Sequence, residues 1–171
     1  MLFKNRLSID NVRKNIVGID KKIMLRNGKK TNYICFDNAA STPTLRPVLE
    51  KVNEFLEWYS SIHRGTGYKS VISTRTYDDS RKIVADFLNA DFEKNVVIYV
   101  KNSTEAINKL SYRLQLDKND VVITSLMEHH SNDLPWRNKC RTLYANVLED
   151  GRLDLDDLEK KLALNKGRVK L

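Results

Sequence analysis

The second half of the chain alternates short apolar runs with segments of helical periodicity. Residues 96–100, 121–124 and 142–148 are rich in β-branched and apolar side chains. Between these runs, residues 103–114 repeat apolar side chains at intervals of three and four, and residues 130–139 form a shorter amphipathic segment. Repeated strand–helix–strand units form parallel sheets with helices on their faces. The sequence therefore predicts an α/β fold with a mostly parallel sheet and flanking helices.

The first half predicts helices before the sheet begins. Residues 32–36 indicate a short extended segment, and residues 44–59 indicate an amphipathic helix capped by Thr44. A glycine-containing loop is expected over residues 60–73, and a second helix over residues 74–88. The apolar positions of the first helix are expected to face inward: Val48, Val52, Phe55, Leu56 and Tyr59.

The last twenty residues predict a helix and the beginning of one more strand. Asp154 can cap a helix with Leu155, Leu158 and Leu162 on its inner face, and residues 168–171 begin a further strand. Because no helix follows to cover that strand, we expect the sheet to be incomplete within these 171 residues.

The positive charge is concentrated at the N-terminus. The formal net charge is +8, and residues 1–31 contain nine Lys and Arg against two Asp, which leaves +1 for residues 32–171. We therefore expect a basic extension over residues 1–31 and a domain portion over residues 32–171. The extension lacks interleaved aromatic residues and any known nucleic-acid motif, so a solvated, partly helical lead-in is favoured over a nucleic-acid partner.

Composition excludes several classes of protein. No apolar run has the length of a membrane span and no signal peptide is evident, which favours a cytoplasmic protein without a membrane partner. The chain has no Walker loop and no GxGxxG segment. Cys35 and Cys140 match no CxxC or zinc spacing, so we expect two buried thiols, no disulfide and no metal.

Two polar segments follow predicted strands, where ligands bind in α/β sheets. Residues 102–105, Asn-Ser-Thr-Glu, open a helix, and its N-terminus suits either a phosphate group or only an N-cap. Residues 128–130, Glu-His-His, end the next strand and admit a cofactor pocket, a metal site or incidental histidines. Adjacent histidines are poorly spaced for one metal ion, and Ser131 lacks the GxSxG context of a hydrolase. A strand-end imidazole is well suited to stacking on an aromatic cofactor and to moving protons.

Four segments in order resemble signature segments of the pyridoxal-phosphate enzymes of the class V aminotransferase group. They cover residues 37–43, 63–65, 103–108 and 128–136. The subgroup they most resemble is the cysteine desulfurase and selenocysteine lyase family. The doubled histidine followed by Ser-Asn and Pro-Trp is similar to the branch that passes sulfur to an acceptor protein. The resemblance implies part of a large domain of the aspartate-aminotransferase type.

The resemblance also implies roles for individual residues. His129 matches the histidine that stacks on the pyridine ring and carries a proton in catalysis. Thr104, with the backbone N–H of Glu105, matches the group that holds the phosphate of pyridoxal 5′-phosphate. Four other residues match segments that line the substrate pocket, two of them in a loop that this family builds across a homodimer interface: Ala39, Ala40, His63 and Arg64.

The sequence also departs from the family pattern. Lys101-Asn102-Ser103 replaces a glycine-containing approach to the phosphate. No Ser-x-His-Lys segment for the Schiff-base lysine is present, and neither cysteine matches the sulfur-accepting position. We therefore expect a truncated chain that is inactive alone.

The activity implied for the full enzyme is removal of sulfur or selenium from cysteine or selenocysteine, giving alanine. Two alternatives stay open. One is another class V aminotransferase or lyase, and the other is a non-catalytic fragment that acts as a dimerisation or binding module.

Overall fold

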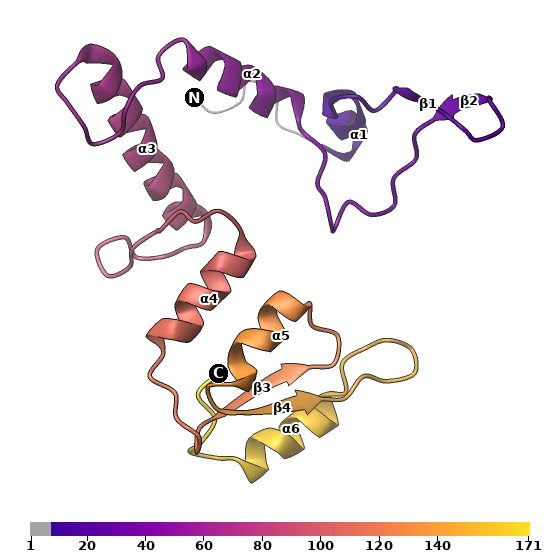
Figure 1. Ribbon diagram of the computed structural model, residues 1–171, viewed down its shortest axis with the longest axis vertical. Helices are drawn as coiled ribbons and strands as arrows, with labels where there is room; N and C mark the ends of the chain where they lie inside the picture. The colour runs from indigo at the N-terminus through magenta and orange to yellow at the C-terminus, as the bar shows by residue number, and fades with distance from the viewer. Residues whose placement is uncertain (1–7) are drawn as a thin grey trace. The chain divides into compact units, whose positions relative to one another are not determined.

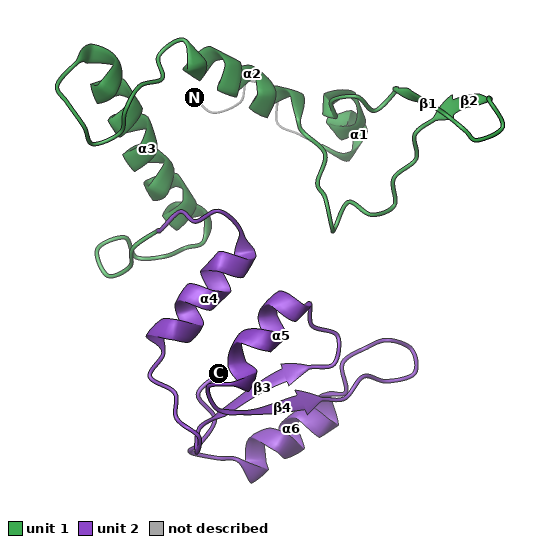
Figure 2. Ribbon diagram, in the orientation of Figure 1, with its two compact units in different colours: residues 1–97 green, residues 98–171 purple. Residues whose placement is uncertain are grey.

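The computed structural model describes residues 8–171 and forms two compact units, residues 1–97 and residues 98–171 (Figure 2). The units divide between Val97 and Ile98. The predicted division at residue 31, into a basic extension and a cofactor-binding portion, stays a prediction.

Residues 8–97 of unit 1 form short helices, one hairpin and two longer helices (Figure 1). The hairpin is antiparallel, and its turn contains Gly28 with φ +78°, a conformation that glycine adopts without strain. Its strand β2 ends at Asn32, so most of the predicted extended segment 32–36 is not strand. The elements are α1 (Ile9–Val12), the 3₁₀ helix η1 (Arg13–Asn15), β1 (Lys22–Met24), β2 (Lys30–Asn32), α2 (Arg46–Leu56) and α3 (Tyr68–Phe87).

Helix α3 begins six residues before the predicted start, inside the segment that was expected to be a loop. The reason lies in two buried serines. The Ser70 hydroxyl donates to the Ser61 carbonyl at 2.7 Å, and the Ser73 hydroxyl accepts from the Ser60 N–H at 2.8 Å. Serine is a residue typical of turns, but here the two serine side chains bond the preceding loop to the helix and so extend the helix.

Helix α2 is shorter than predicted, since it spans Arg46–Leu56 and not residues 44–59, and it also differs in its cap and its surroundings. The N-cap is Leu45, not Thr44. No residue of α2 is buried, and Val48, Val52 and Leu56 are each about half exposed or more, so no element among residues 8–97 covers this part of the apolar stripe. None of the described helices is long and apolar enough to cross a membrane.

Unit 2 has the predicted parallel sheet. Strands β3 and β4 pair in parallel, with Val121 opposite Arg141. The last residues add a third parallel segment beside β3, because the Val121 N–H donates to the Arg168 carbonyl and the Ile123 N–H to the Leu171 carbonyl, both at 2.9 Å. The elements are α4 (Ser103–Arg113), β3 (Val121–Ser125), α5 (His130–Arg137), β4 (Arg141–Ala145) and α6 (Leu155–Leu164).

The strand order places helices on both faces of this sheet. The chain passes from β3 outward to β4 through α5, then returns through α6 to the far side of β3. Parallel crossovers are right-handed, and these two crossovers run in opposite directions across the sheet. Helices α5 and α6 therefore lie on opposite faces of the sheet, as Figure 1 shows. Helix α4 packs against α5. The core joins Val122, Trp136 and Cys140, with Ile107, Leu114 and Leu116 packed against it.

Two predictions about apolar segments are wrong. The run 96–100 forms no strand, and Val96 and Ile98 are 64% and 68% exposed. A strand of this kind needs hydrogen-bonded neighbours and covered faces, and no strand of the described residues pairs with it. In α6, Asp154 is the predicted cap, but Leu155 and Leu162 are exposed.

Candidate functional site

One pocket of unit 2, of about 550 Å³, lies against α4 and α5. Thr104 from the first turn of α4 and His129 from the start of α5 both line it. These two residues come from the starts of two different helices and are 25 positions apart in the sequence. The structure thus brings together two of the three residues that were predicted to bind a cofactor.

The first wall of the pocket is one face of α4, which begins with Thr104 in the capped first turn. The Asn102 side chain is the N-cap and accepts from the Glu105 N–H at 2.9 Å. In return, the Glu105 carboxylate accepts from the Lys101 N–H at 2.8 Å. This N–H and then Lys109 lower the pKa of Glu105. The Glu105 amide predicted to hold a phosphate is therefore already bonded to Asn102.

Thr104 sits in the same first turn, where backbone N–H groups have no intrahelical partner and the helix dipole is positive. Its side chain is exposed, and its carbonyl accepts from the Asn108 amide at 2.8 Å. Asn108 lies one turn further along the same wall of the pocket. The arrangement suits an anion at the helix end.

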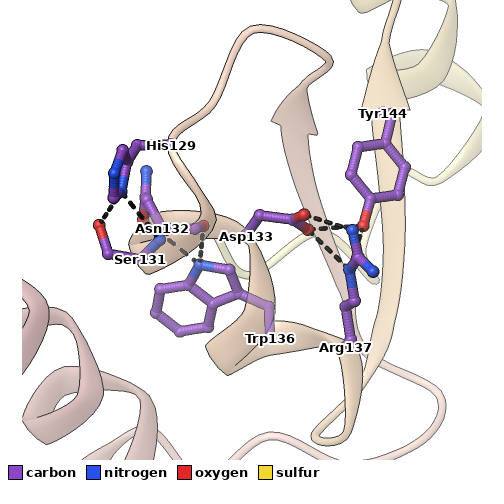
Figure 3. Close-up of polar contacts among 7 residues, drawn as sticks. All are labelled: His129, Ser131, Asn132, Asp133, Trp136, Arg137 and Tyr144. Atoms are coloured by element: carbon purple, nitrogen blue, oxygen red, sulfur yellow. Dashed lines mark hydrogen bonds and ion pairs between the residues drawn. The ribbon is translucent and has the colours of Figure 1, made fainter.

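The second wall begins with His129, which is the N-cap of α5 (Figure 3). Its Nδ1 accepts from the Ser131 N–H at 3.1 Å and lies 2.8 Å from the Ser131 hydroxyl. A backbone N–H can only donate, so Nδ1 is an acceptor and the proton of the neutral ring is on Nε2. The His130 ring is 6.3 Å away and tilted by 55°, so the two imidazoles do not stack.

A chain of polar contacts fixes the start of α5 behind His129. The Glu128 carboxylate accepts from the Asn132 amide at 3.0 Å and from the Ser125 hydroxyl at 3.4 Å. The buried Trp136 indole donates to the Asn132 carbonyl at 2.8 Å. Glu128 therefore ties the end of β3 to the first turn of the helix.

The opposite side of α5 has a network that the sequence analysis did not find (Figure 3). Asp133, only 6% exposed, accepts from Tyr144 Oη at 2.7 Å and pairs with Arg137, whose Nε lies at 2.9 Å. Arg137 and then Tyr144 lower the pKa of Asp133, and Asp133 in turn raises the pKa of Tyr144. The spacing of Asp133 and Arg137 at i and i+4 was the available signal.

Three further pocket residues were also missed. Asn108 and Tyr112 follow Thr104 at intervals of four along α4, and Lys139 lies beyond the end of α5. The Lys139 ammonium lies 4.2 Å from the centre of the Tyr112 ring, which is a cation–π contact. Helical spacing from Thr104 would have identified the two α4 residues.

Comparison with known proteins gives the family. The family model described as "Aminotransferase class-V" matches residues 34–171. The chain belongs to this family. It is 39% identical over 137 residues to a probable cysteine desulfurase of Pyrococcus abyssi, covering 75% of this chain and 34% of that protein. It is 30% identical over 167 residues to one of Streptomyces coelicolor, covering 90% and 39%.

A solved structure agrees with these relatives. The apo structure of a cysteine desulfurase from Thermococcus onnurineus NA1 is 32% identical and covers 94% of this chain and 39% of its own chain, with a TM-score of 0.74. The chain thus spans about a third to two fifths of the length of these relatives. The predicted resemblance and the α/β fold class, part of the pyridoxal-phosphate-dependent transferase fold, are confirmed.

The four residues matched to the class V substrate pocket all lie in unit 1. Ala39 and Ala40 are exposed in a turn. His63 has φ +53°; its N–H donates to Thr74 Oγ1 at 3.0 Å, and its ring lies 3.2 Å from the Asp78 carboxylate. The Arg64 carbonyl accepts from the Ser61 hydroxyl at 2.8 Å. Their roles stay predictions.

The two cysteines differ in their surroundings. Cys140 is buried against the Trp136 carbonyl, with its Sγ at 3.8 Å, and burial raises the pKa of its thiol. Cys35 is only half-buried, so the expectation of two buried thiols is right for Cys140 alone. Among residues 8–171, no group of three His, Cys, Asp or Glu could hold a metal ion.

The pocket has a donor set that fits the cofactor of the class V family. Its volume of about 550 Å³ lies in the range of small-molecule sites. The hydroxyl and helix end at Thr104 suit a phosphate, and the imidazole of His129 offers an aromatic face.

Proposed function

We propose that this chain forms the phosphate- and ring-binding part of a pyridoxal-phosphate-dependent cysteine desulfurase-like enzyme. Such an enzyme removes sulfur from cysteine, or selenium from selenocysteine, and leaves alanine. The observation that carries the proposal is that Thr104 and His129 line one pocket. The relatives that bear the name cysteine desulfurase support the choice of reaction within the family.

Each wall of the pocket has a distinct task in this proposal. Thr104 and the N-terminus of α4 bind the phosphate, assisted by the amide of Glu105 when it exchanges its bond to Asn102 for one to the ligand. His129 stacks on the pyridine ring, and its Nε2 holds and moves a proton at the substrate carbon. When bound, the cofactor supplies an electron sink for that carbon.

The remaining partners of the reaction follow from the resemblance. We assign Ala39, Ala40, His63 and Arg64 to the substrate pocket, in a cytoplasmic homodimer that passes sulfur to an acceptor protein. The exposed apolar stripe of α2 supports a second subunit. No residue of these 171 is assigned to the Schiff base or to sulfur acceptance, so the isolated chain is expected to bind the cofactor without turning over cysteine.

The test is binding of pyridoxine 5′-phosphate, which has the ring and phosphate of the cofactor but no aldehyde to react with surface lysines. Chemical shifts of backbone amides are followed during titration of the ¹⁵N-labelled chain. We expect the largest shifts at the Ser103 and Thr104 amides, because they lie in the first turn of α4.

Two variants separate the phosphate from the ring. Thr104→Val removes the hydroxyl, and His129→Asn removes the ring but keeps an N-cap acceptor for the Ser131 N–H. Each is expected to weaken binding at least tenfold. Thr142→Val, the same substitution as at Thr104 but in β4, is the matched control and should bind like the wild type. Unchanged binding by both pocket variants contradicts the proposed site.

A further inference from the structure

The basic charge near the N-terminus has no task in the proposed function, yet the structure gathers part of it around a second pocket. This pocket lies in unit 1 and has a volume of about 580 Å³. Four cationic side chains line it: Arg13, Lys14, Lys21 and Arg46. Three of them come from residues 1–31 and the fourth from the first position of α2.

Backbone pairing brings these two segments together. Ile16 and Leu45 form an antiparallel bridge, and the Val17 N–H donates to the Thr44 carbonyl at 2.9 Å. The chain then turns at Gly18, which has φ +77°, a conformation open to glycine without strain. This pairing carries the start of α2 to the segment around residues 13–21.

The charge in this pocket is only weakly neutralised. Asp20 is the one carboxylate among the described residues that line it, so the side chains there have a net charge of +3. It lies 3.4 Å from Arg13, and both side chains are mostly exposed, 81% and 66%. Exposed pairs of this kind contribute little, so the arginine stays available to a stronger anion. The positive end of α2 adds to the same field.

The lining also limits the kind of anion. Half-buried Ile16 and Ile19 form an apolar part of the wall, and no aromatic ring lies among the described residues that line the pocket. Single-stranded nucleic acid is held by stacking on aromatic side chains, so it is not favoured here. Two guanidinium forks and two ammonium groups match the several oxygens of a phosphate.

We propose that this pocket binds a compact organic phosphate with two or more negative charges. The site is separate from the proposed cofactor pocket, since its lining residues all belong to unit 1. Its ligand is recognised by charge and by phosphate geometry, and not by base stacking.

The experiment is a titration of the full chain with pyrophosphate at low salt, followed by calorimetry and by backbone amide shifts. Arg13→Gln combined with Lys21→Gln removes two of the four cations. Lys29→Gln combined with Lys30→Gln, at the hairpin, removes the same charge outside the pocket and is the matched control. Circular dichroism verifies that both double variants stay folded.

We expect shifts at the Gly18 and Lys21 amides, at least tenfold weaker binding in the pocket variant, and binding within about twofold of wild type in the control. Equal losses in the two double variants would show general charge attraction and overturn the proposal. So would citrate binding as tightly as pyrophosphate, because the site would then not select phosphate. Shifts confined to Ser103 and Thr104 would overturn it too while leaving the proposed cofactor pocket intact.

Discussion

A pair of substitutions at Asn102 separates the capping of α4 from its ability to hold a phosphate. The Asn102 side chain accepts from the Glu105 N–H at 2.9 Å and is the N-cap of an 11-residue helix. Asn102→Ala removes that acceptor, and loss of an N-cap side chain costs about 1 kcal/mol. Asn102→Asp keeps the acceptor and adds about 0.3–1 kcal/mol from the helix dipole. Urea unfolding should therefore rank the aspartate variant highest and the alanine variant lowest.

The same two variants are expected to rank differently in binding. A carboxylate at the N-cap and a phosphate at the first turn are separated by about one helical pitch, roughly 5.4 Å. Two unit charges at that distance repel by roughly 0.8–3 kcal/mol for effective dielectric constants of about 80 to 20. Asn102→Asp should thus bind pyridoxine 5′-phosphate about 4- to 160-fold more weakly, although it is the more stable protein.

The assay is amide-shift titration beside urea unfolding, with the salt concentration held fixed, because screening weakens the repulsion. In the alanine variant the Glu105 amide is released, so we expect binding equal to or tighter than in the wild type. Equal affinity of the aspartate variant and the wild type for pyridoxine 5′-phosphate would refute the reasoning, because a new carboxylate at the end of α4 must repel a phosphate bound there.

Two further substitutions test the packing of unit 2. Arg137 lowers the pKa of Asp133 in the folded chain. The ionised Asp133 carboxylate therefore stabilises the fold above the ordinary carboxyl pKa of 3.8, and this stabilisation is lost as the pH falls through the lowered pKa of the folded chain. Asp133→Asn should accordingly be less stable than wild type near neutral pH, with a gap that narrows in acid, as followed by unfolding between about pH 2.5 and 7. Thr142 Oγ1 is buried and has no hydrogen-bond partner among the described residues. Thr142→Val should therefore raise the free energy of unfolding by about 1 kcal/mol, and a lower free energy of unfolding measured in urea would contradict this.

The elements of unit 2 could be predicted from sequence because local and tertiary signals agree there. Val121 and Val122 are the most buried residues of β3, as their β-branched side chains suggest. Asn102 caps α4, and Asp154 caps α6. The apolar run 96–100 has an equally strong local pattern but no partner strand among the described residues. A strand is completed by its neighbours, so local sequence alone could not decide it.

The residues of the candidate site at helix starts could be predicted from the sequence. The residues that depend on contacts between separate helices and strands could not. The roles of Thr104 and His129 were predicted from the resemblance to the class V group, and their places after apolar runs agreed with a ligand site without deciding it. The network of Asp133 with Tyr144 joins a helix to a strand, and no local pattern shows which strand that is. The early start of α3 was missed for a related reason, since Ser70 and Ser73 stabilise it through contacts with the loop before it.

The proposed cofactor pocket is lined along α4 and α5, and each helix contributes a residue from its N-terminal end, Thr104 and His129. Histidine is not among the preferred N-cap residues, yet here its Nδ1 accepts the Ser131 N–H of α5. The cap bond fixes the ring orientation and leaves the proton on Nε2, the nitrogen that the proposed reaction uses. Asparagine at this position would cap the helix at least as well, so His129→Asn should keep or raise stability while weakening cofactor binding. A coupled loss of stability and binding would instead mean that the imidazole serves mainly to hold α5 in place.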